Sequence, residues 1–210
     1  MHILFLNGSP KKHGLLSQMI GTMKLEAEHC GVMVHEIRTY DLNIHPCCGC
    51  MTCRTSRTCK LPKDDVQQVA ALIQQADVLV VASPCYWGNM SGTLKQLFDR
   101  IVYVLTKESE RGIPQPLQKG KKALIITTCS TPFLFNRWFH QSSGTVSRIK
   151  EILRWSGYQV KGTIQRAGTK KNNQLTANDR KKCHKLIHKI IQTSRFISNV
   201  LSPTQCRAAL

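Results

Sequence analysis

The sequence predicts an α/β fold in which one parallel sheet is covered by helices on both faces. Short, fully apolar runs alternate with longer segments of helical spacing along the whole chain. Runs such as 3–7 and 78–82 have no polar face, which is typical of parallel strands buried on both sides. A regular alternation of strand and helix is the pattern of a doubly wound sheet.

The first half of the chain supplies three predicted strands and the helices between them. Strand 3–7 leads to helix 15–30, whose apolar stripe includes Leu15, Met19 and Met23 and which Gly31 ends. Strand 32–37 is followed by an irregular segment at 39–63. A helix from Asp64-Asp65 to about residue 76 comes next, since carboxylates are favourable at a helix start.

The second half continues the same alternation. After strand 78–82, we expect a helix at about 92–105, a connection at 107–120, a strand at 123–127 and a helix at 146–155. A last strand at 158–164 and a closing helix at about 175–200 complete the series. No repeat or low-complexity linker divides the sequence. We therefore expect residues 1–210 to form one domain with a cysteine-rich loop at about 45–63.

Positive charge is concentrated in the last third of the sequence. The formal net charge is +18, and residues 145–210 hold 14 Lys and Arg against 2 Asp and Glu. A nucleic-acid-binding face is one interpretation, but the segment lacks the interleaved aromatic side chains of a base-stacking surface. We favour a solvated helical surface that attracts anionic cofactors. With no apolar run of 18 residues and no secretory signal, the sequence predicts a soluble, cytoplasmic protein without a membrane partner.

The first predicted strand runs into a segment suited to an anion. Residues 8–14, Gly-Ser-Pro-Lys-Lys-His-Gly, join this strand to the first helix. Ser9, Lys11 and the later Ser17 supply hydroxyls and positive charge where amides at a helix start can surround a phosphate. Neither the Rossmann nor the Walker glycine pattern is present. The segment predicts a mononucleotide phosphate site, with an ordinary basic turn as the alternative.

A second polar segment, residues 83–91, follows the other central strand. In a sheet of order 2-1-3-4-5, these two strands flank the point where the chain switches faces, and ligands bind there. Tyr86 and Trp87, beside Gly88 and Asn89, are suited to line a flat ring, with backbone amides reaching its polar edge. The alternative is that both aromatic side chains pack beneath a loop. The presence of two suitable segments at one crevice favours the ligand site.

Three motifs give the chain a resemblance to a known family. Asn-Gly-Ser-Pro-Lys-Lys-x-Gly is followed by Pro-x-x-Gly-Cys-x-x-Cys and by Ser-Pro-x-Tyr-x-Gly-Asn-x-Ser-x-x-Leu-Lys-x-x-Phe-Asp-Arg. Over roughly residues 1–127 the sequence resembles the NADPH-dependent FMN reductase and iron–sulfur flavoprotein superfamily. The resemblance implies a flavodoxin-like fold with a five-stranded parallel sheet of order 2-1-3-4-5. It also implies bound FMN, NADPH or NADH as electron donor, and a homodimer or homotetramer.

The same resemblance implies roles for particular residues. Phosphate-binding roles fall on Ser9, Lys11 and Ser17. Roles in binding the ring and covering its edge fall on nine residues of two later loops: Pro84, Cys85, Tyr86, Trp87, Gly88, Asn89, Thr128, Cys129 and Ser130. Because the flavin supplies the redox chemistry, the protein binds, orients and excludes water, and we name no catalytic residue.

The cysteine-rich loop allows three interpretations. Cys47, Cys50, Cys53 and Cys59 have a compact spacing that can hold a four-iron four-sulfur cluster. This spacing is similar to the cluster motif of the iron–sulfur flavoproteins. Zinc is less natural, because its knuckles usually pair Cys-x-x-Cys motifs from distant sites. The third interpretation is a loop of reduced thiols without metal, and the sequence leaves the choice open.

Three classes of function follow. The leading hypothesis is an FMN-dependent NAD(P)H oxidoreductase that passes electrons to a quinone, free flavin or another small-molecule acceptor. The first alternative is an electron-transfer protein that uses FMN, with or without a cluster, and docks to a redox partner. The second is a nucleic-acid-binding module that uses the basic C-terminal third.

Overall fold

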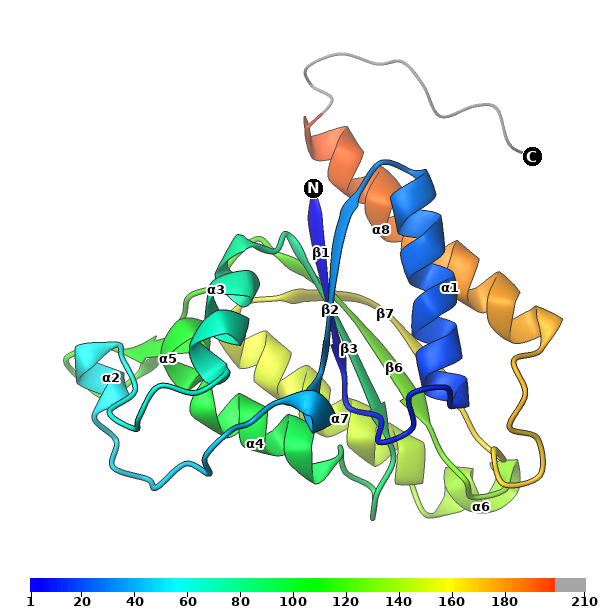
Figure 1. The fold of residues 1–210 in the computed structure, drawn as a ribbon, viewed down its shortest axis with the longest axis horizontal. Coiled ribbons are helices and arrows are strands. Elements are labelled where there is room, and N and C mark those ends of the chain that lie inside the picture. Colours follow the sequence, from blue (N-terminus) through cyan, green and yellow to red (C-terminus); the bar gives the residue numbers. More distant parts are fainter. Residues whose placement is uncertain (199–210) are drawn as a thin grey trace.

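The architecture is a five-stranded parallel sheet between two helical layers (Figure 1). A computed structural model describes residues 1–198, with the side chains of residues 1–193. The sheet has the order β2-β1-β3-β6-β7 and is built from β1 (His2–Asn7), β2 (Met33–Arg38), β3 (Val78–Pro84), β6 (Lys122–Thr128) and β7 (Gln159–Arg166). Numbered within the sheet alone, this is the predicted order 2-1-3-4-5. The flavodoxin-like α/β fold is therefore confirmed.

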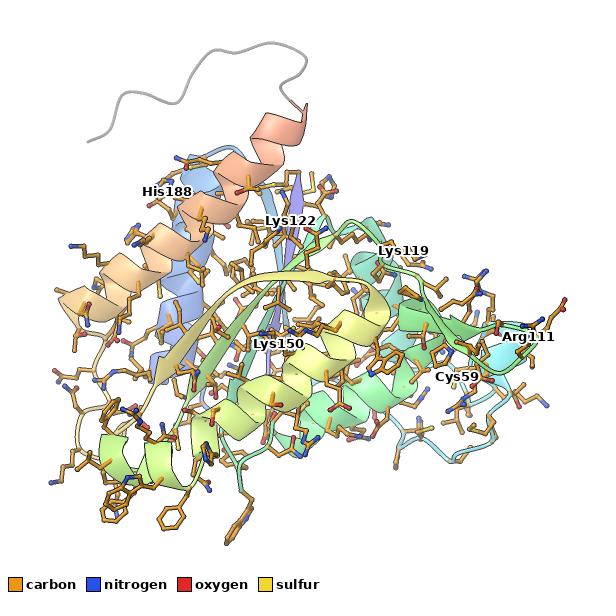
Figure 2. All side chains as sticks on the ribbon, turned by 180° about the vertical axis from the view of Figure 1, so that it is seen from behind. Cys59, Arg111, Lys119, Lys122, Lys150 and His188 are labelled. Atoms are coloured by element: carbon orange, nitrogen blue, oxygen red, sulfur yellow. The ribbon has the colours of Figure 1, made fainter. Side chains whose placement is uncertain are left out.

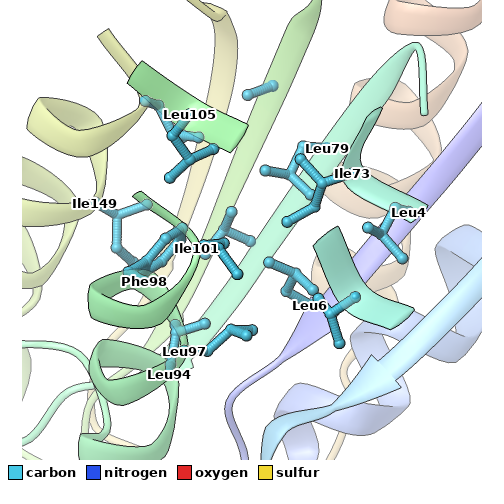
Figure 3. Packing of buried hydrophobic residues seen from close by; sticks show 14 of the residues in the cluster. Leu4, Leu6, Ile73, Leu79, Leu94, Leu97, Phe98, Ile101, Leu105 and Ile149 are labelled. Carbon is cyan, nitrogen blue, oxygen red and sulfur yellow. The ribbon is translucent and has the colours of Figure 1, made fainter. Parts of the chain in front are cut away.

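The helices divide between the two faces of the sheet. One face carries α1 (Leu15–His29) and α8 (Ala177–Ser198), and the other carries α3 (Val66–Gln75), α4 (Gly92–Arg100), α5 (Val102–Leu105) and α7 (Gln141–Ser156). Successive side chains along each central strand point to opposite faces of the sheet and pack in the two cores. Leu4 and Leu6 pack with the α3–α7 layer (Figure 3), while Ile3 and Phe5 pack with α1 and α8. No helix within residues 1–198 is long and apolar enough to cross a membrane.

Several predicted boundaries were wrong. The helix expected at 92–105 breaks at Ile101 into α4 and α5, and three of the four residues from Ile101 to Val104 are β-branched, which lowers helix propensity. The connection at 107–120 contains an antiparallel pair, β4 (Thr106–Glu108) and β5 (Pro114–Pro116). The helix expected at 146–155 begins earlier, at Gln141. The end of the last predicted helix, residues 199–200, lies outside the described residues.

Three short elements escaped the sequence patterns. They are the 3-10 turn η1 (Thr39–Asp41), α2 (Cys53–Ser56) in the cysteine-rich loop, and α6 (Phe133–Trp138) before α7. None of them has a buried apolar side chain, so none leaves a periodic apolar stripe in the sequence.

A buried ion pair anchors the base of the cysteine-rich loop. The helix predicted from Asp64 begins only at Val66, because the Asp64 carboxylate is engaged by the loop and by α4. It accepts hydrogen bonds from the His45 amide at 3.0 Å and from Arg100 Nη1 at 2.7 Å. The Arg100 side chain is 0% exposed and that of Asp64 2%. Arg100 also donates to the His45 carbonyl, so one buried guanidinium joins α4, the loop and the start of α3.

Asp64→Asn is expected to lower the free energy of unfolding by about 3–5 kcal/mol, because it leaves a buried guanidinium without its counter-charge. Asp99→Asn is the matched control. Asp99 pairs with Lys95 on the surface of α4, with both side chains about half exposed, and its loss is expected to change stability by less than about 0.5 kcal/mol. Urea denaturation measures both values, and equal stability of the two variants would contradict this role of Asp64.

The same pair predicts a dependence of stability on pH. Burial works to raise the pKa of Asp64, but hydrogen bonds from the His45 amide and Arg100 outweigh it and lower the pKa to about 2. A carboxyl whose pKa is lowered on folding stabilises the fold above its unfolded pKa of about 4. This contribution is expected to disappear as the pH falls from about 4 to about 2. Asp64→Asn is expected to remove that part of the acid dependence.

Candidate functional site

The loop after β1 forms a compact turn around the side chain of Asn7. Asn7 is fully buried, and its Nδ2 donates to Ser17 Oγ at 3.2 Å and to Glu36 Oε1 at 2.9 Å. Its Oδ1 accepts the Ser9 amide at 3.0 Å. Ser9 Oγ accepts the Lys11 amide at 3.2 Å, and Ser17 Oγ donates to the Lys11 carbonyl at 2.9 Å. The predicted residues Ser9, Lys11 and Ser17 are thus brought together in one turn.

The start of α1 faces this turn without a capping side chain. Gly14 is its N-cap and makes no side-chain hydrogen bond, and no acidic residue lies in the first turn. Leu15 and Leu16 instead point into the core, where each is 3% exposed. The first amides of a helix have no partner within the helix itself. They are suited to bind an anion, which the nearby positive charge of Lys11 also favours.

The loop after β3 lies beside this turn and ends in a tight reversal. Tyr86 and Asn89 exchange two backbone hydrogen bonds of 2.9 Å across Trp87 and Gly88, whose φ angles are +52° and +72°. This is the geometry of a type I′ turn, which usually requires Gly, Asn or Asp. Trp87 sits at its tip with a side chain that is 100% exposed, and Tyr86 is 44% exposed. Packing beneath a loop, the alternative interpretation, does not describe Trp87.

Helix α7 supports this turn from behind. Thr145 Oγ1 donates to the Asn89 carbonyl at 3.0 Å. A Cβ on Gly144 would lie 2.6 Å from the Gly88 carbonyl oxygen, so only glycine allows the helix to approach so closely. The turn is therefore held by backbone contacts while its aromatic side chains remain free to meet a ligand.

The loop after β6 completes the edge. The Cys85 amide donates to the Thr128 carbonyl at 2.8 Å, and the Cys129 amide donates to the Arg166 carbonyl at 2.8 Å. Burial raises the pKa of the Cys85 thiol, and the neighbouring Cys129 raises it further. Ser130 is exposed at the surface. All three loops with predicted FMN contacts therefore lie at the carboxyl ends of adjacent strands.

The cysteine-rich loop leaves the same edge after η1 and runs along the flank of the molecule to α2, which packs against α5 and β4. Figure 2 shows Cys59 beside the hairpin of β4 and β5. Burial raises the pKa of the Cys53 thiol, and the thiols of Cys59, Cys47 and Cys50 raise it further. Cys53 thus has as its electrostatic neighbours the three other predicted cluster ligands.

Single-ion geometry is not preformed in this loop. A zinc ion with bonds of about 2.3 Å holds its four sulfurs less than about 4 Å apart. Among the described residues, no three of these thiols come within 4.8 Å of one another. A four-iron cluster is larger than one ion and holds its thiolates further apart. The thiols are thus not positioned in advance for a single zinc ion, and every cysteine from Cys47 to Cys183 is a free thiol.

The sequence profile of the NADPH-dependent FMN reductase family matches residues 1–137. The chain belongs to this family. Every predicted site residue lies within the matched region. The region matched by the family thus includes all three loops at the carboxyl edge and the stretch that holds the cysteines.

Individual relatives agree with the family assignment. An iron–sulfur flavoprotein of Archaeoglobus fulgidus is 32% identical over 95 residues, which are 45% of this chain and 43% of that protein. An iron–sulfur flavoprotein of Clostridioides difficile is 24% identical over 193 residues, 91% of this chain and 78% of that protein. The chain thus spans about half the length, 43% to 56%, of several curated relatives that it matches.

A solved structure shows the same fold. An FMN-dependent NADH-azoreductase from Bacillus anthracis, in complex with FMN, superposes with a TM-score of 0.67 at 15% identity. The superposition covers 90% of this chain and 98% of the azoreductase. At this level of identity the likeness concerns the fold alone.

The edge of the sheet that carries the loops after β1, β3 and β6 has buried polar donors without partners in the described part of the chain. These donors show whether the residues present fit the phosphate of FMN. Ser91 Oγ and Arg38 Nη1 are buried, and neither has a hydrogen-bond partner among the described residues. Arg38 lies beside the turn at residues 8–17, which we call the phosphate turn for the role predicted for it, since Arg38 Nη2 donates to the Ser9 carbonyl at 3.5 Å. Buried donors normally have partners. Hydroxyl, guanidinium and free helix amides form a donor set that fits a phosphate dianion.

Sequence reasoning missed four residues of this edge. Asn7 and Ser91 stand inside motifs that were recognised, but only the structure reveals Asn7 as the centre of the turn and Ser91 as an unpaired hydroxyl. Thr127 Oγ1 at the end of β6 is likewise buried without a partner in the described part of the chain. Arg38 is the last residue of the edge strand β2, and a single Arg at the end of a strand forms no sequence pattern that would indicate a role.

Helix α6 adds an aromatic surface that the sequence did not indicate. Four side chains of α6 and that of Phe139, which follows it, are between 49% and 67% exposed. The four in the helix are Phe133, Leu134, Phe135 and Trp138. The Phe135 ring stacks on Phe139 at 6.3 Å and meets Trp138 edge to face at 5.9 Å. We call these five residues the α6 aromatic surface. Because α6 follows β6 directly, this surface lies at the same edge as the three loops (Figure 1).

Gly8→Ala is expected to destabilise the fold by about 1–3 kcal/mol, because the junction of the two central loops has no room for a methyl group. A Cβ at Gly8 would lie 2.8 Å from Ser91 Oγ and 3.1 Å from the Ala82 carbonyl. Gly21→Ala is the control, since a Cβ there meets no atom within 4 Å. In the interior of α1 it is expected to stabilise by about 0.5–1 kcal/mol.

Thermal and urea unfolding measure both changes. Adding Ser91→Ala to Gly8→Ala is expected to recover part of the loss, because the closest contact is then removed. A Gly8→Ala protein as stable as the wild type would show that the loops do not approach this closely.

Proposed function

We propose that this chain binds FMN at the edge formed by the loops after β1, β3 and β6. There it acts as an NAD(P)H oxidoreductase that passes electrons to a quinone, free flavin or another small acceptor. The observation that carries the proposal is the uncapped start of α1 beside two buried donors without partners, Ser91 Oγ and Arg38 Nη1. Membership of the FMN reductase family supports the choice of cofactor.

The residues of the edge divide the work of binding. Asn7 fixes the turn, so that Ser9, Ser17 and the α1 amides are held in position for a phosphate before it arrives. The turn at residues 86–89 offers a flat ring the side chains of Tyr86 and Trp87 and the amides of Trp87 and Gly88, which take no part in the two bonds across the turn. FMN, when bound, supplies the transfer of hydride and electrons between nicotinamide and acceptor. The chain's part is to orient the ring, leave one face open for the nicotinamide and exclude water.

The α6 aromatic surface is proposed to take part in this exclusion. Its exposed rings, together with Trp87, present apolar area beside the proposed ring site. Large exposed apolar areas mark sites for ligands or other proteins. We propose that the protein is a homodimer or homotetramer in which a second copy covers part of this surface. An aromatic acceptor such as a quinone is the other ligand whose shape suits it.

An electron-transfer protein that docks to a redox partner is the second candidate, and the cysteine-rich loop is the observation that favours it. The thiols of Cys47, Cys50 and Cys59 are electrostatic neighbours of Cys53, and no three of the thiols in the described part of the chain are close enough together to hold a single ion as they stand. A cluster there would add a one-electron centre to a flavin that exchanges two electrons. Steady consumption of NADH or NADPH with a small quinone supports the first candidate. Reduction of the bound cofactors without turnover supports the second.

The variant Ser9→Ala/Lys11→Ala is expected to weaken FMN binding by about 2–4 kcal/mol, because it removes a hydroxyl and a positive charge from the phosphate turn. This is a loss of about 30- to 1,000-fold in affinity, measured by calorimetric titration of FMN into the apoprotein.

Riboflavin is the matched ligand, since it has the same ring and no phosphate. Its affinity is expected to be nearly the same for the wild type and the double variant. An equal loss for both ligands would mean that the variant has disturbed the fold, and no loss for FMN would place the phosphate elsewhere.

Anaerobically purified protein is expected to be brown and to contain about four irons per chain, because four thiolates at this spacing can hold a cubane cluster. Cys53→Ser is expected to abolish the iron-dependent absorption, since it removes the ligand at the centre of the group. Cys48→Ser is the control and is expected to keep it, because Cys48 stands outside the spacing.

Metal analysis and the visible spectrum report iron and flavin separately. A yellow protein that takes up no iron after anaerobic reconstitution would refute the cluster. The proposed FMN site would be unaffected by that result.

A further inference from the structure

We propose that Glu26, His184 and His188 form a binding site for a divalent transition metal, with zinc as the best match, that ties α8 to α1. Among the described residues these three are the group of His, Cys, Asp and Glu side chains whose ligand atoms all lie within 4.8 Å of one another. The site is separate from the proposed FMN edge, and none of the three residues contributes to the phosphate turn.

The distances between the ligand atoms are close to those found in a zinc site. His184 Nδ1 lies 2.9 Å from Glu26 Oε2, and His188 Nε2 lies 2.6 Å from Glu26 Oε1. In a tetrahedral site with bonds of about 2.0–2.1 Å, neighbouring ligand atoms are about 3.3 Å apart. The two His–Glu26 distances are shorter than this, and all three ligand atoms lie within 4.8 Å of one another, so the three side chains need to separate only slightly to admit an ion.

The helices hold these side chains in place through the core beneath them. His184 and His188 are four residues apart, so they share one face of α8. The buried neighbours Cys183 and Ile187 fix that face against α1, where Met23 and Ala27 flank Glu26. Figure 1 shows α1 and α8 side by side, and Figure 2 labels His188 on α8. A metal here would join two helices that are already packed.

The donor set selects the class of metal. Two imidazole nitrogens and one carboxylate suit zinc, nickel and copper, whereas magnesium and calcium prefer oxygen ligands only. Both imidazole rings are 44% exposed, so the nitrogen remote from the metal can keep its proton and bind water. Three protein ligands leave a fourth position for water, as in sites of two His and one Glu.

The surrounding charge sets a limit on affinity. Lys181, Lys185 and Lys189 are exposed on the same helix. They repel a dication, but salt screens exposed charges over about 8 Å at physiological ionic strength. The Glu26 carboxylate is only 18% exposed and lies directly against both rings, so its attraction is screened less. The direct bonds to the ion are therefore expected to outweigh the repulsion by these exposed lysines.

The test is calorimetric titration of zinc into the full chain, carried out in a Cys50→Ser/Cys53→Ser background so that the thiols do not compete. The parent is expected to bind one zinc per chain at this site. His188→Ala is expected to weaken that binding by about 100-fold or more, since the loss of even an outer-shell partner costs 10- to 100-fold. His35→Ala, which removes an exposed histidine of β2, is the control and is expected to leave the affinity unchanged.

Thermal stability and amide exchange are a second measurement, which tests whether the metal joins α8 to α1. Zinc is expected to raise the melting temperature of the parent and to slow amide exchange in α8, and to do neither in His188→Ala. Equal zinc affinity in the parent and in His188→Ala would overturn the proposal, as would magnesium binding of equal strength. If far-ultraviolet circular dichroism shows that His188→Ala is misfolded, His184→Ala and Glu26→Gln decide by the same criteria.

Discussion

The pairing of β1 with β3 is the interaction on which the site depends. It places Asn7 opposite Ala82, and the Gly8 amide continues the ladder with a 2.8 Å bond to the Ala82 carbonyl. The two loops therefore leave the sheet side by side, and Gly8 can pass Ser91 because it has no Cβ. The helices that follow these strands cover opposite faces of the sheet, which is the point where doubly wound folds generally bind ligands. The turn after β1 and the turn at residues 86–89 lie at the same edge of the sheet for this reason.

A different kind of constraint holds the cysteine-rich loop. The loop has few buried apolar side chains, and its base is fixed by polar bonds to Asp64, Arg100 and Gln96. Burial works to lower the pKa of Arg100, but hydrogen bonds with Asp64 and Cys59 outweigh it and raise the pKa. The Arg100 guanidinium thus interacts both with Asp64 at the base of the loop and with Cys59, a predicted cluster ligand. Beyond that point Cys47 and Cys50 are exposed, so a bound cluster would contribute much of the loop's order.

The sequence was sufficient for the sheet because buried parallel strands carry an unbroken apolar run, as 78–82 does. It placed the residues predicted to bind the phosphate and the ring at one edge of the sheet, because the carboxyl ends of parallel strands meet there. It failed where structure depends on contacts that leave no periodic pattern. Arg38 and Ser91 acquire a role only from neighbours distant in sequence. Helix α6 lies on the surface with its aromatic side chains exposed, so its pattern resembled a loop.

Helix α1 connects the two proposed ligand sites without bringing them into contact. Ser17 lies in its first turn at the phosphate site and Glu26 nine residues later, which separates them by about 14 Å along the axis at 1.5 Å per residue. This exceeds the distance of about 8 Å over which salt leaves exposed charges coupled. FMN and zinc are therefore not expected to sense each other electrostatically. Ligands that bind the folded chain more tightly than the unfolded chain at these two sites would stabilise the same packed unit of α1, β1 and α8, and their effects on stability should add.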